Sequence, residues 1–257
     1  MPSSDLCLTD LSNKIKTVSK AYLDNNVIVD IEDGKYSVEQ FLNKDGYAYY
    51  FSQAHIEELL EAKGNPKISQ SGRLNLLSKL CGKNNILTGV TDVPEFFDKE
   101  PIEMYNLAAN TTYLLRQLIH QAVNQYDEMA LKVRQELGFD TKQFNNESPE
   151  NVLSIIDNRM KETSGIDLYS YLTRTEAIMG KPIYHTLMQL IDMANYWGDK
   201  KTNRSDVARL YDSSHAYFAQ LCDVLVTNDK KMSMKVKAIY SFLNVKTKVV
   251  SAFDFLN

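Results

Sequence analysis

Short apolar runs near both ends of the chain lead directly into residues that commonly begin helices. Near the N-terminus, the runs AYLDNNVIVDI and YAYYFS are rich in β-branched and aromatic residues, and Ser52 starts the helical pattern SQAHIEELLEAKGN. Near the C-terminus, CDVLVTND precedes KKMSMKVKAIYSFLN, and VKTKVVS follows. A strand that leads through a capping residue into a helix is typical of a parallel α/β sheet. We therefore expect both ends of the chain to belong to one α/β domain.

The residues between these ends follow a different pattern. From Pro101 to about Asn203, apolar residues recur three and four positions apart, as in MYNLAANTTYLLRQLIHQAVNQYDEMALKVRQEL and PIYHTLMQLIDMANYW. This spacing predicts long amphipathic helices. We expect residues 1–100, with a leading helix over residues 1–20, and residues 204–257 to form the α/β domain. Residues 101–203 are then an all-helical insertion.

Composition indicates a globular protein. The chain has 257 residues, of which 44% are hydrophobic, and this is enough to bury a substantial core. No apolar stretch approaches the roughly 20 residues that cross a bilayer, and the first residues lack the basic and then apolar order of a signal peptide. The three cysteines are widely separated and match no zinc or disulfide pattern. We expect a reduced, cytoplasmic protein with no membrane partner.

The charge balance bears on possible nucleic-acid partners. A formal net charge of −4 argues against a generally basic surface, although a local basic patch can still bind phosphates. One such patch is the run KKMSMKVK, which starts at Lys230. Its lysines form either a solvated helix face or a rim that holds the backbone of a substrate strand.

Four acidic residues stand at or near the ends of the expected elements. Asp24 lies in the first apolar run, Glu58 on the helix after the second run, Asp212 on the helix before CDVLVTND, and Asp229 at the tip of that strand. The carboxyl ends of parallel strands and the adjoining helices meet at one edge of a sheet. Clustered carboxylates must be protonated or neutralised, and Mg²⁺ and Mn²⁺ prefer carboxylate oxygens. The sequence therefore predicts a Mg²⁺ or Mn²⁺ site at this edge.

Each of these residues also has an ordinary structural interpretation. Asp24 and Asp229 can cap strand ends or pair with nearby lysines, and Glu58 can belong to a solvated helix face. Asp206 lies six residues before Asp212 on the same segment, and either can be a helix N-cap. His215, three residues after Asp212, can contact phosphate or hydrogen-bond to its neighbour. An unpaired charge against an apolar run is costly to bury, and this favours the metal for Asp24 and Asp229.

Three of these stretches resemble the PIN-domain ribonucleases. YLDNNVIVD is similar to the family's first strand with its Asp, FSQAHIEELLE to its Ser-led helix bearing a Glu, and YDSSHAYFAQLCDVLVTND to its third acid on a helix and the following strand that ends in Thr-Asn-Asp. The resemblance covers roughly residues 20–90 and 205–251. Asn25 stands where the family usually has Thr, and compact members lack the long helical middle.

The resemblance implies a three-layer α/β/α fold with a mainly parallel sheet. It also implies an endoribonuclease that hydrolyses RNA phosphodiester bonds with metal-activated water. Asp24, Glu58, Asp212 and Asp229 would hold the metal. Residues that would orient these carboxylates or contact the substrate are Asn26, Ser52, Thr227, Asn228, His215 and Lys230.

Several functional alternatives stay open at this point. The substrate could be DNA, although the acidic balance favours RNA. A nuclease of this kind could be a toxin- or defence-type effector of a toxin–antitoxin pair, restrained by an inhibitor protein. The helical insertion could serve recognition or homo-oligomer formation. A protein of another class, an inactive PIN-like scaffold that binds a partner through the insertion, has the same pattern of helices.

Overall fold

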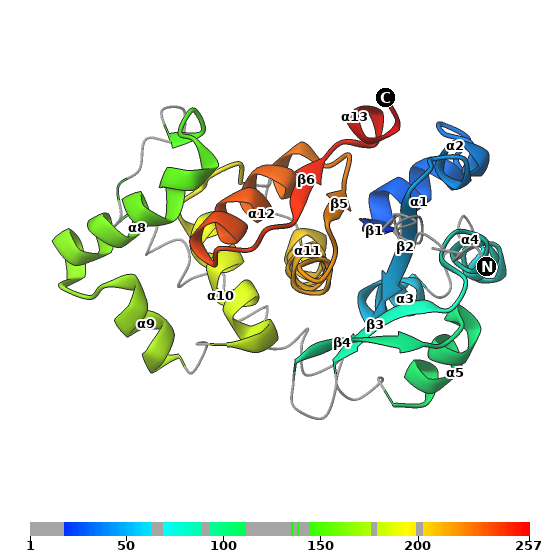
Figure 1. Cartoon of the computed structure of the whole chain (residues 1–257). Helices are drawn as coiled ribbons and strands as arrows, with labels where there is room; N and C mark the ends of the chain where they lie inside the picture. Colours follow the sequence, from blue (N-terminus) through cyan, green and yellow to red (C-terminus); the bar gives the residue numbers. More distant parts are fainter. Residues whose placement is uncertain are drawn as a thin grey trace, which may run out of the picture.

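The computed structural model in Figure 1 describes residues 18–62, 69–88, 93–111, 135, 138, 144–175, 179–198 and 203–257. Within these residues, six strands form one sheet in the order β4-β3-β2-β1-β5-β6. Neighbouring strands are parallel except for β3 and β4. The predicted α/β class with a mainly parallel sheet is confirmed. The strands are β1 (Ser19–Leu23), β2 (Tyr47–Ser52), β3 (Asn84–Thr88), β4 (Pro94–Asp98), β5 (Val224–Val226) and β6 (Lys248–Val250).

Helices cover both faces of this sheet. The side chains of β1 alternate between two cores, so that Tyr22 lies in one core while Ala21 and Leu23 lie in the other. This alternation follows from the two-residue period of a strand that is buried on both faces. The helices are α1 (Asn25–Glu32), α2 (Val38–Leu42), α3 (Gln53–Glu61), α4 (Gln70–Cys81), α5 (Pro101–Thr111), α8 (Pro149–Ser164), α9 (Leu168–Arg174), α10 (Gly180–Met193), α11 (Asn203–Ala219), α12 (Lys230–Phe242) and α13 (Ala252–Leu256).

The sequence pattern predicted one strand over the first apolar run, AYLDNNVIVDI. The structure instead has a strand followed by a helix there. β1 ends at Leu23 and α1 begins at Asn25, because Asp24 caps the helix and accepts a hydrogen bond from the Asn25 amide. The residues Val27, Ile28 and Ile31 recur three and four positions apart and bury one face of α1. The leading helix expected over residues 1–20 falls on residues 1–17, which lie outside the described ranges, and on Ser19 and Lys20, which belong to β1.

Every regular element that the structure describes within residues 101–203 is a helix. Helices α8, α9 and α10 pack with α11 and α12 in the same core that contains Tyr22 of β1 and Leu225 of β5. Figure 1 shows α8, α9 and α10 on the α12 side of the sheet, while α4 and α5 lie at the other end of the view. Helices α8, α9 and α10 therefore extend this core beyond α11 and α12, whereas α5 packs with α3 and α4. No described helix is both long enough and apolar enough to cross a bilayer.

The pairing of β1 with β5 brings the two ends of the chain together at the centre of the sheet. Ala21 lies opposite Val224, and Leu23 opposite Val226. The Asp24 amide then donates to the Val226 carbonyl at 2.9 Å. Because the strands run in parallel, both carboxyl ends stop at the same edge, where Asp24 begins α1 and Asp229 begins α12.

Candidate metal centre at the carboxyl edge of the sheet

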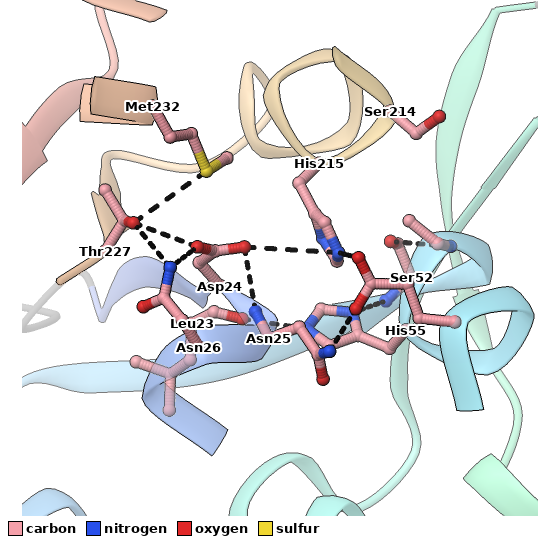
Figure 2. Close-up of polar contacts among 12 residues, drawn as sticks. Leu23, Asp24, Asn25, Asn26, Ser52, His55, Ser214, His215, Thr227 and Met232 are labelled. Atoms are coloured by element: carbon pink, nitrogen blue, oxygen red, sulfur yellow. Dashed lines mark hydrogen bonds and ion pairs between the residues drawn. The ribbon is translucent and has the colours of Figure 1, made fainter. Parts of the chain in front are cut away.

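Asp24 is the buried centre of this edge, with only 3% of its surface exposed. Its Oδ1 accepts from the Asn25 amide at 2.8 Å, and its Oδ2 accepts from the Thr227 hydroxyl at 2.9 Å and from the Asn26 side-chain amide. Figure 2 shows Asn26 and Thr227 on one side of this carboxylate and His215 on the other. All of the hydrogen-bond donors to Asp24 are neutral groups, so they fix its orientation without cancelling its charge.

Glu58 reaches the same edge from α3. Its Oε2 accepts from the Asn25 side-chain amide, and its Oε1 lies 3.4 Å from His215 Nε2. That nitrogen is also 4.0 Å from Asp24 Oδ1. His215 therefore stands between the two carboxylates. Asn25, which departs from the Thr usual in PIN domains, here links the first helix to Glu58.

Asp212 and Asp229 complete the group of acids. Asp212 lies one helical turn before His215 on α11 and is partly exposed. Asp229 is exposed and caps α12, because its Oδ1 accepts from the amides of Lys231 at 2.8 Å and Met232 at 3.0 Å. Its own amide donates to Thr227 Oγ1 at 3.2 Å, so one hydroxyl touches both Asp24 and Asp229. The site thus extends from a buried acid to an acid at the surface.

The four carboxylates interact electrostatically. Burial raises the pKa of Asp212 well above its usual value, and Asp24, Asp229 and Glu58 raise it further, while Lys235 opposes them. Burial, together with Glu58, raises the pKa of Asp24 to about 6 despite the opposing effect of His215. Burial works against a charge on His215, but Glu58 and Asp24 raise its pKa above the usual value. Without another cation, protons and one imidazolium balance these acids.

The Tyr22 hydroxyl joins His215 to Ser52 and His55 in a buried hydrogen-bond network. The Tyr22 hydroxyl lies 2.7 Å from His215 Nδ1, 2.6 Å from Ser52 Oγ and 3.3 Å from His55 Nδ1. His55 Nδ1 accepts from the Ser52 amide, so its Nε2 carries the proton and donates to the Leu23 carbonyl at 2.7 Å. Burial and the nearby His215 lower the pKa of His55, which stays neutral. Through Nδ1, this network orients the His215 ring, whose Nε2 faces the carboxylates.

The donor set fits a hard divalent ion such as Mg²⁺ or Mn²⁺. Besides the four carboxylates, Asn25 Oδ1 is buried at this edge without a hydrogen-bond partner, and His215 Nε2 is buried 3.4 Å from Glu58 Oε1. An unsatisfied carbonyl oxygen beside carboxylates is a suitable ligand for such ions, and Mn²⁺ also accepts imidazole nitrogen. In the described ranges, however, no three His, Cys, Asp or Glu side chains already surround a common point closely enough to hold an ion. A bound ion would have to draw the carboxylates closer together.

Three other residues proposed from the sequence lie at this edge but turn away from the acids. Ser52 belongs to the network around Tyr22, where its Oγ also accepts from the Ala54 amide at 3.2 Å. Asn228 donates to Asp30 at 2.6 Å and accepts from the Ala252 amide at 2.9 Å, so it ties α12 to other elements. Lys230 directs its ammonium to the ring of Trp197.

Local sequence patterns do not indicate four residues of this arrangement. Tyr22 fits only a strand pattern, and Asn25 stands out only as a departure from the family pattern. Lys235 belongs to a run typical of surface lysines, yet only 1% of its surface is exposed. The Met232 sulfur lies 3.8 Å from the Thr227 hydroxyl. The strand period, which directs Tyr22 to the face opposite Ala21 and Leu23, was the one usable signal.

Comparisons with protein-family models, with curated proteins and with solved structures found no match to this chain.

Proposed function

We propose that this protein is a Mg²⁺- or Mn²⁺-dependent nuclease of the PIN-like type that hydrolyses phosphodiester bonds in RNA. One observation carries the proposal. Carboxylates from distant parts of the chain gather at the carboxyl edge of the sheet, and no described lysine or arginine forms an ion pair with any of Asp24, Glu58, Asp212 and Asp229. Such a group is costly for a fold unless a cation binds it.

Each residue of the site has a role in this proposal. Asp24, Glu58, Asp212 and Asp229 would hold the metal, which would supply activation of water for attack on the phosphodiester. Asn26 and Thr227 keep the Asp24 carboxylate in one orientation through their hydrogen bonds. Asp229 is exposed, so a phosphodiester can approach the site from its side.

RNA cleavage by an Asp229→Asn variant tests the proposal. Asparagine also caps helices well, so the variant should keep α12 and lose only the charge. With Mg²⁺, we expect the unaltered chain to cut single-stranded RNA and the variant to be at least about 100-fold slower, which corresponds to about 2.7 kcal/mol of barrier. EDTA should abolish cutting by both proteins.

Asp167→Asn is the matched control, because Asp167 caps α9 away from the acids and accepts from the Ser170 amide at 2.6 Å. It should cut RNA at the rate of the unaltered chain. Equal rates for both variants, or cutting that persists in EDTA, would remove the proposal. DNA of the same sequence, tested in parallel, decides the substrate.

The position of His215 favours one alternative function. A protonated imidazole between Asp24 and Glu58 supplies a positive charge where an ion would otherwise lie. In that state the protein would be a PIN-like binding protein without hydrolytic activity. Calorimetry with Mn²⁺ separates the two functions, because the alternative predicts no heat of binding at neutral pH.

A further inference from the structure

A strained turn lies beside the surface end of the site. Residues 195–198 follow α10, and two of them, Asn195 and Trp197, have positive φ angles of 60° and 49°. Asparagine tolerates this conformation, but a bulky side chain such as tryptophan adopts it rarely, at a cost of about 1 to 3 kcal/mol. The requirements of the turn alone therefore do not explain the tryptophan at position 197.

The surrounding structure holds this turn firmly. The Trp197 amide donates to Asn145 Oδ1 at 2.6 Å, and the Tyr196 hydroxyl donates to the Glu147 carbonyl at 3.1 Å. Tyr196 is fully buried, and its ring packs edge-on against Phe144. The conformation of Trp197 is thus imposed by contacts on both sides of the turn.

The turn fixes two lysines at the start of α12, directly after Asp229. The Lys230 ammonium lies 4.7 Å from the centre of the Trp197 ring, and the Lys231 ammonium donates to the Gly198 carbonyl at 3.2 Å. Lys230 is exposed, and no carboxylate in the described ranges lies within ion-pair distance of it. Because an indole attracts a cation without neutralising it, the charge of Lys230 stays available to an anion.

We infer that Trp197 and Lys230 form a binding rim for single-stranded nucleic acid at the mouth of the site. An ammonium binds backbone phosphate as a point charge. The Trp197 indole is partly buried, with its ring packed against the core and its Nε1 enclosed, and its exposed part lies beside Lys230, where an unpaired base can stack. Cations with adjacent aromatic rings are the usual means by which proteins hold single strands without reading their sequence. The inference rests on the proposed nuclease function for the choice of ligand.

The chain offers a direct reporter of this contact. It contains one tryptophan, so its intrinsic fluorescence reports Trp197 alone. Binding of a single-stranded oligouridylate in EDTA, where no cutting occurs, should quench this emission in a saturable way. A duplex of the same length should bind about ten-fold more weakly, because its bases are already stacked.

Two substitutions separate the two contacts, with a labelled oligouridylate followed by fluorescence anisotropy. Trp197→Asn should weaken binding about ten-fold or more while it keeps the turn, since asparagine accepts the positive φ angle. Lys230→Gln should reduce the slope of log affinity against log salt by about 0.7, the value for one phosphate contact to a single strand.

Lys248→Gln is the control for nonspecific charge. Lys248 is exposed and pairs with Val224 at the opposite edge of the sheet, so the same change in charge there should leave affinity and salt slope unaltered. The inference is overturned if Trp197→Asn binds the oligonucleotide as tightly as the unaltered chain. It is also overturned if Lys248→Gln weakens binding as much as Lys230→Gln does.

The outcomes distinguish this inference from the proposed function. If the unaltered chain binds single strands through the rim but cuts nothing with Mn²⁺ present, the nuclease proposal fails and the rim stands. If the chain cuts RNA and Trp197→Asn has an unchanged KM, the rim fails and the nuclease stands. With both correct, Trp197→Asn should raise KM about ten-fold and leave kcat nearly unchanged.

Discussion

The molecule contains two buried aspartates that are stabilised in opposite ways. Asp24, at the sheet edge, and Asp192, at the end of α10, are each 3% exposed. Asp192 pairs with Arg209 of α11 at 2.5 Å and with Lys235 of α12 at 2.6 Å. Asp24 instead receives hydrogen bonds from neutral groups, and it has His215 at 4.0 Å and other acids nearby.

On the proposed function, the difference separates an acid that serves the fold from one kept for a ligand. Three helices meet at Asp192, and Arg209 and Lys235 come from two of them, so its charge holds α10, α11 and α12 together. Asp24 forms no ion pair with a described lysine or arginine, and its carboxylate instead caps α1 and accepts hydrogen bonds. The two groups also meet, since Lys235 lies close enough to Asp212 to oppose the rise in its pKa.

The largest expected effect concerns Asp192 and its ion pair with Lys235. Asp192→Asn leaves the almost fully buried ammonium of Lys235 without its anion, and removal of one partner from a buried ion pair typically costs about 3 to 5 kcal/mol. Urea denaturation should show this loss in the free energy of unfolding. The double variant Asp192→Leu with Lys235→Met should recover most of it. A loss below about 1 kcal/mol would mean that the pair does not hold the helices together.

Metal binding is the next largest effect. At a Mn²⁺ concentration 100-fold above its dissociation constant, an ion that binds only the folded state adds about 2.7 kcal/mol to the free energy of unfolding. Thermal denaturation should therefore show a rise in midpoint that Asp229→Asn reduces and Asp167→Asn preserves. If millimolar Mn²⁺ leaves the midpoint of the unaltered chain unchanged, Asp24 is not kept for an ion.

The third effect is a dependence on pH that Asp24 controls. Its pKa is about 6 in the folded protein and near 3.8 in the unfolded chain, so between these values only the folded state keeps the proton. Without metal, the stability of the unaltered chain should fall by about 2 kcal/mol relative to Asp24→Asn as pH rises from 4 to 7.

The sign of that difference should change between the two pH values. At pH 4 the variant should be about 1 kcal/mol less stable, because its amide cannot accept every hydrogen bond made to Asp24. At pH 7 it should be about 1 kcal/mol more stable, once the penalty of about 2 kcal/mol is set against that loss. Chemical denaturation in EDTA at both pH values measures this. A variant that is less stable at both would show that Asp24 is stabilised within the fold as Asp192 is.

The smallest effect concerns the hydroxyl that links the acids. Thr227→Val keeps the shape of a residue that is 2% exposed and removes the donor to Asp24, at a cost of about 1 kcal/mol. Thr247→Val is the matched control, because its hydroxyl is also buried and donates to the Cys222 carbonyl at 2.7 Å, at the other end of β5. Both should lower stability equally, and only Thr227→Val should weaken Mn²⁺ binding. Equal Mn²⁺ affinities would show that Thr227 does not orient the site.

The sequence contained enough information to predict the α/β class and the elements with clear caps. Ser52 begins α3 as expected, because its hydroxyl accepts from the Ala54 amide. The boundary at Asp24 was mistaken because Val27 and Ile28 have strand propensity, and the capping bond of Asp24 determines the conformation instead. The strand β4 and the helix α13 were not predicted, since their stability comes from the rest of the fold.

The parts of the site that the sequence could not reveal depend on contacts between distant residues. The bond between Tyr22 and His215 joins positions 193 apart, and no local pattern indicates it. Lys235 looked like one member of a basic run, but the helical period turns it into the core, where Asp192 receives it. Local patterns placed the acids at an edge, whereas tertiary packing determined which other charges accompany them.

The central pairing of β1 with β5 has a consequence for the time at which the group of acids can form. The acids on either side of that pair cannot meet until residues 224–229 have left the ribosome, and pairing between such distant segments is slow to form. Until then, Asp24 and Glu58 have no Thr227, Asp229 or His215 beside them. On the proposed nuclease function, a nascent chain would leave intact the messenger from which it is being translated.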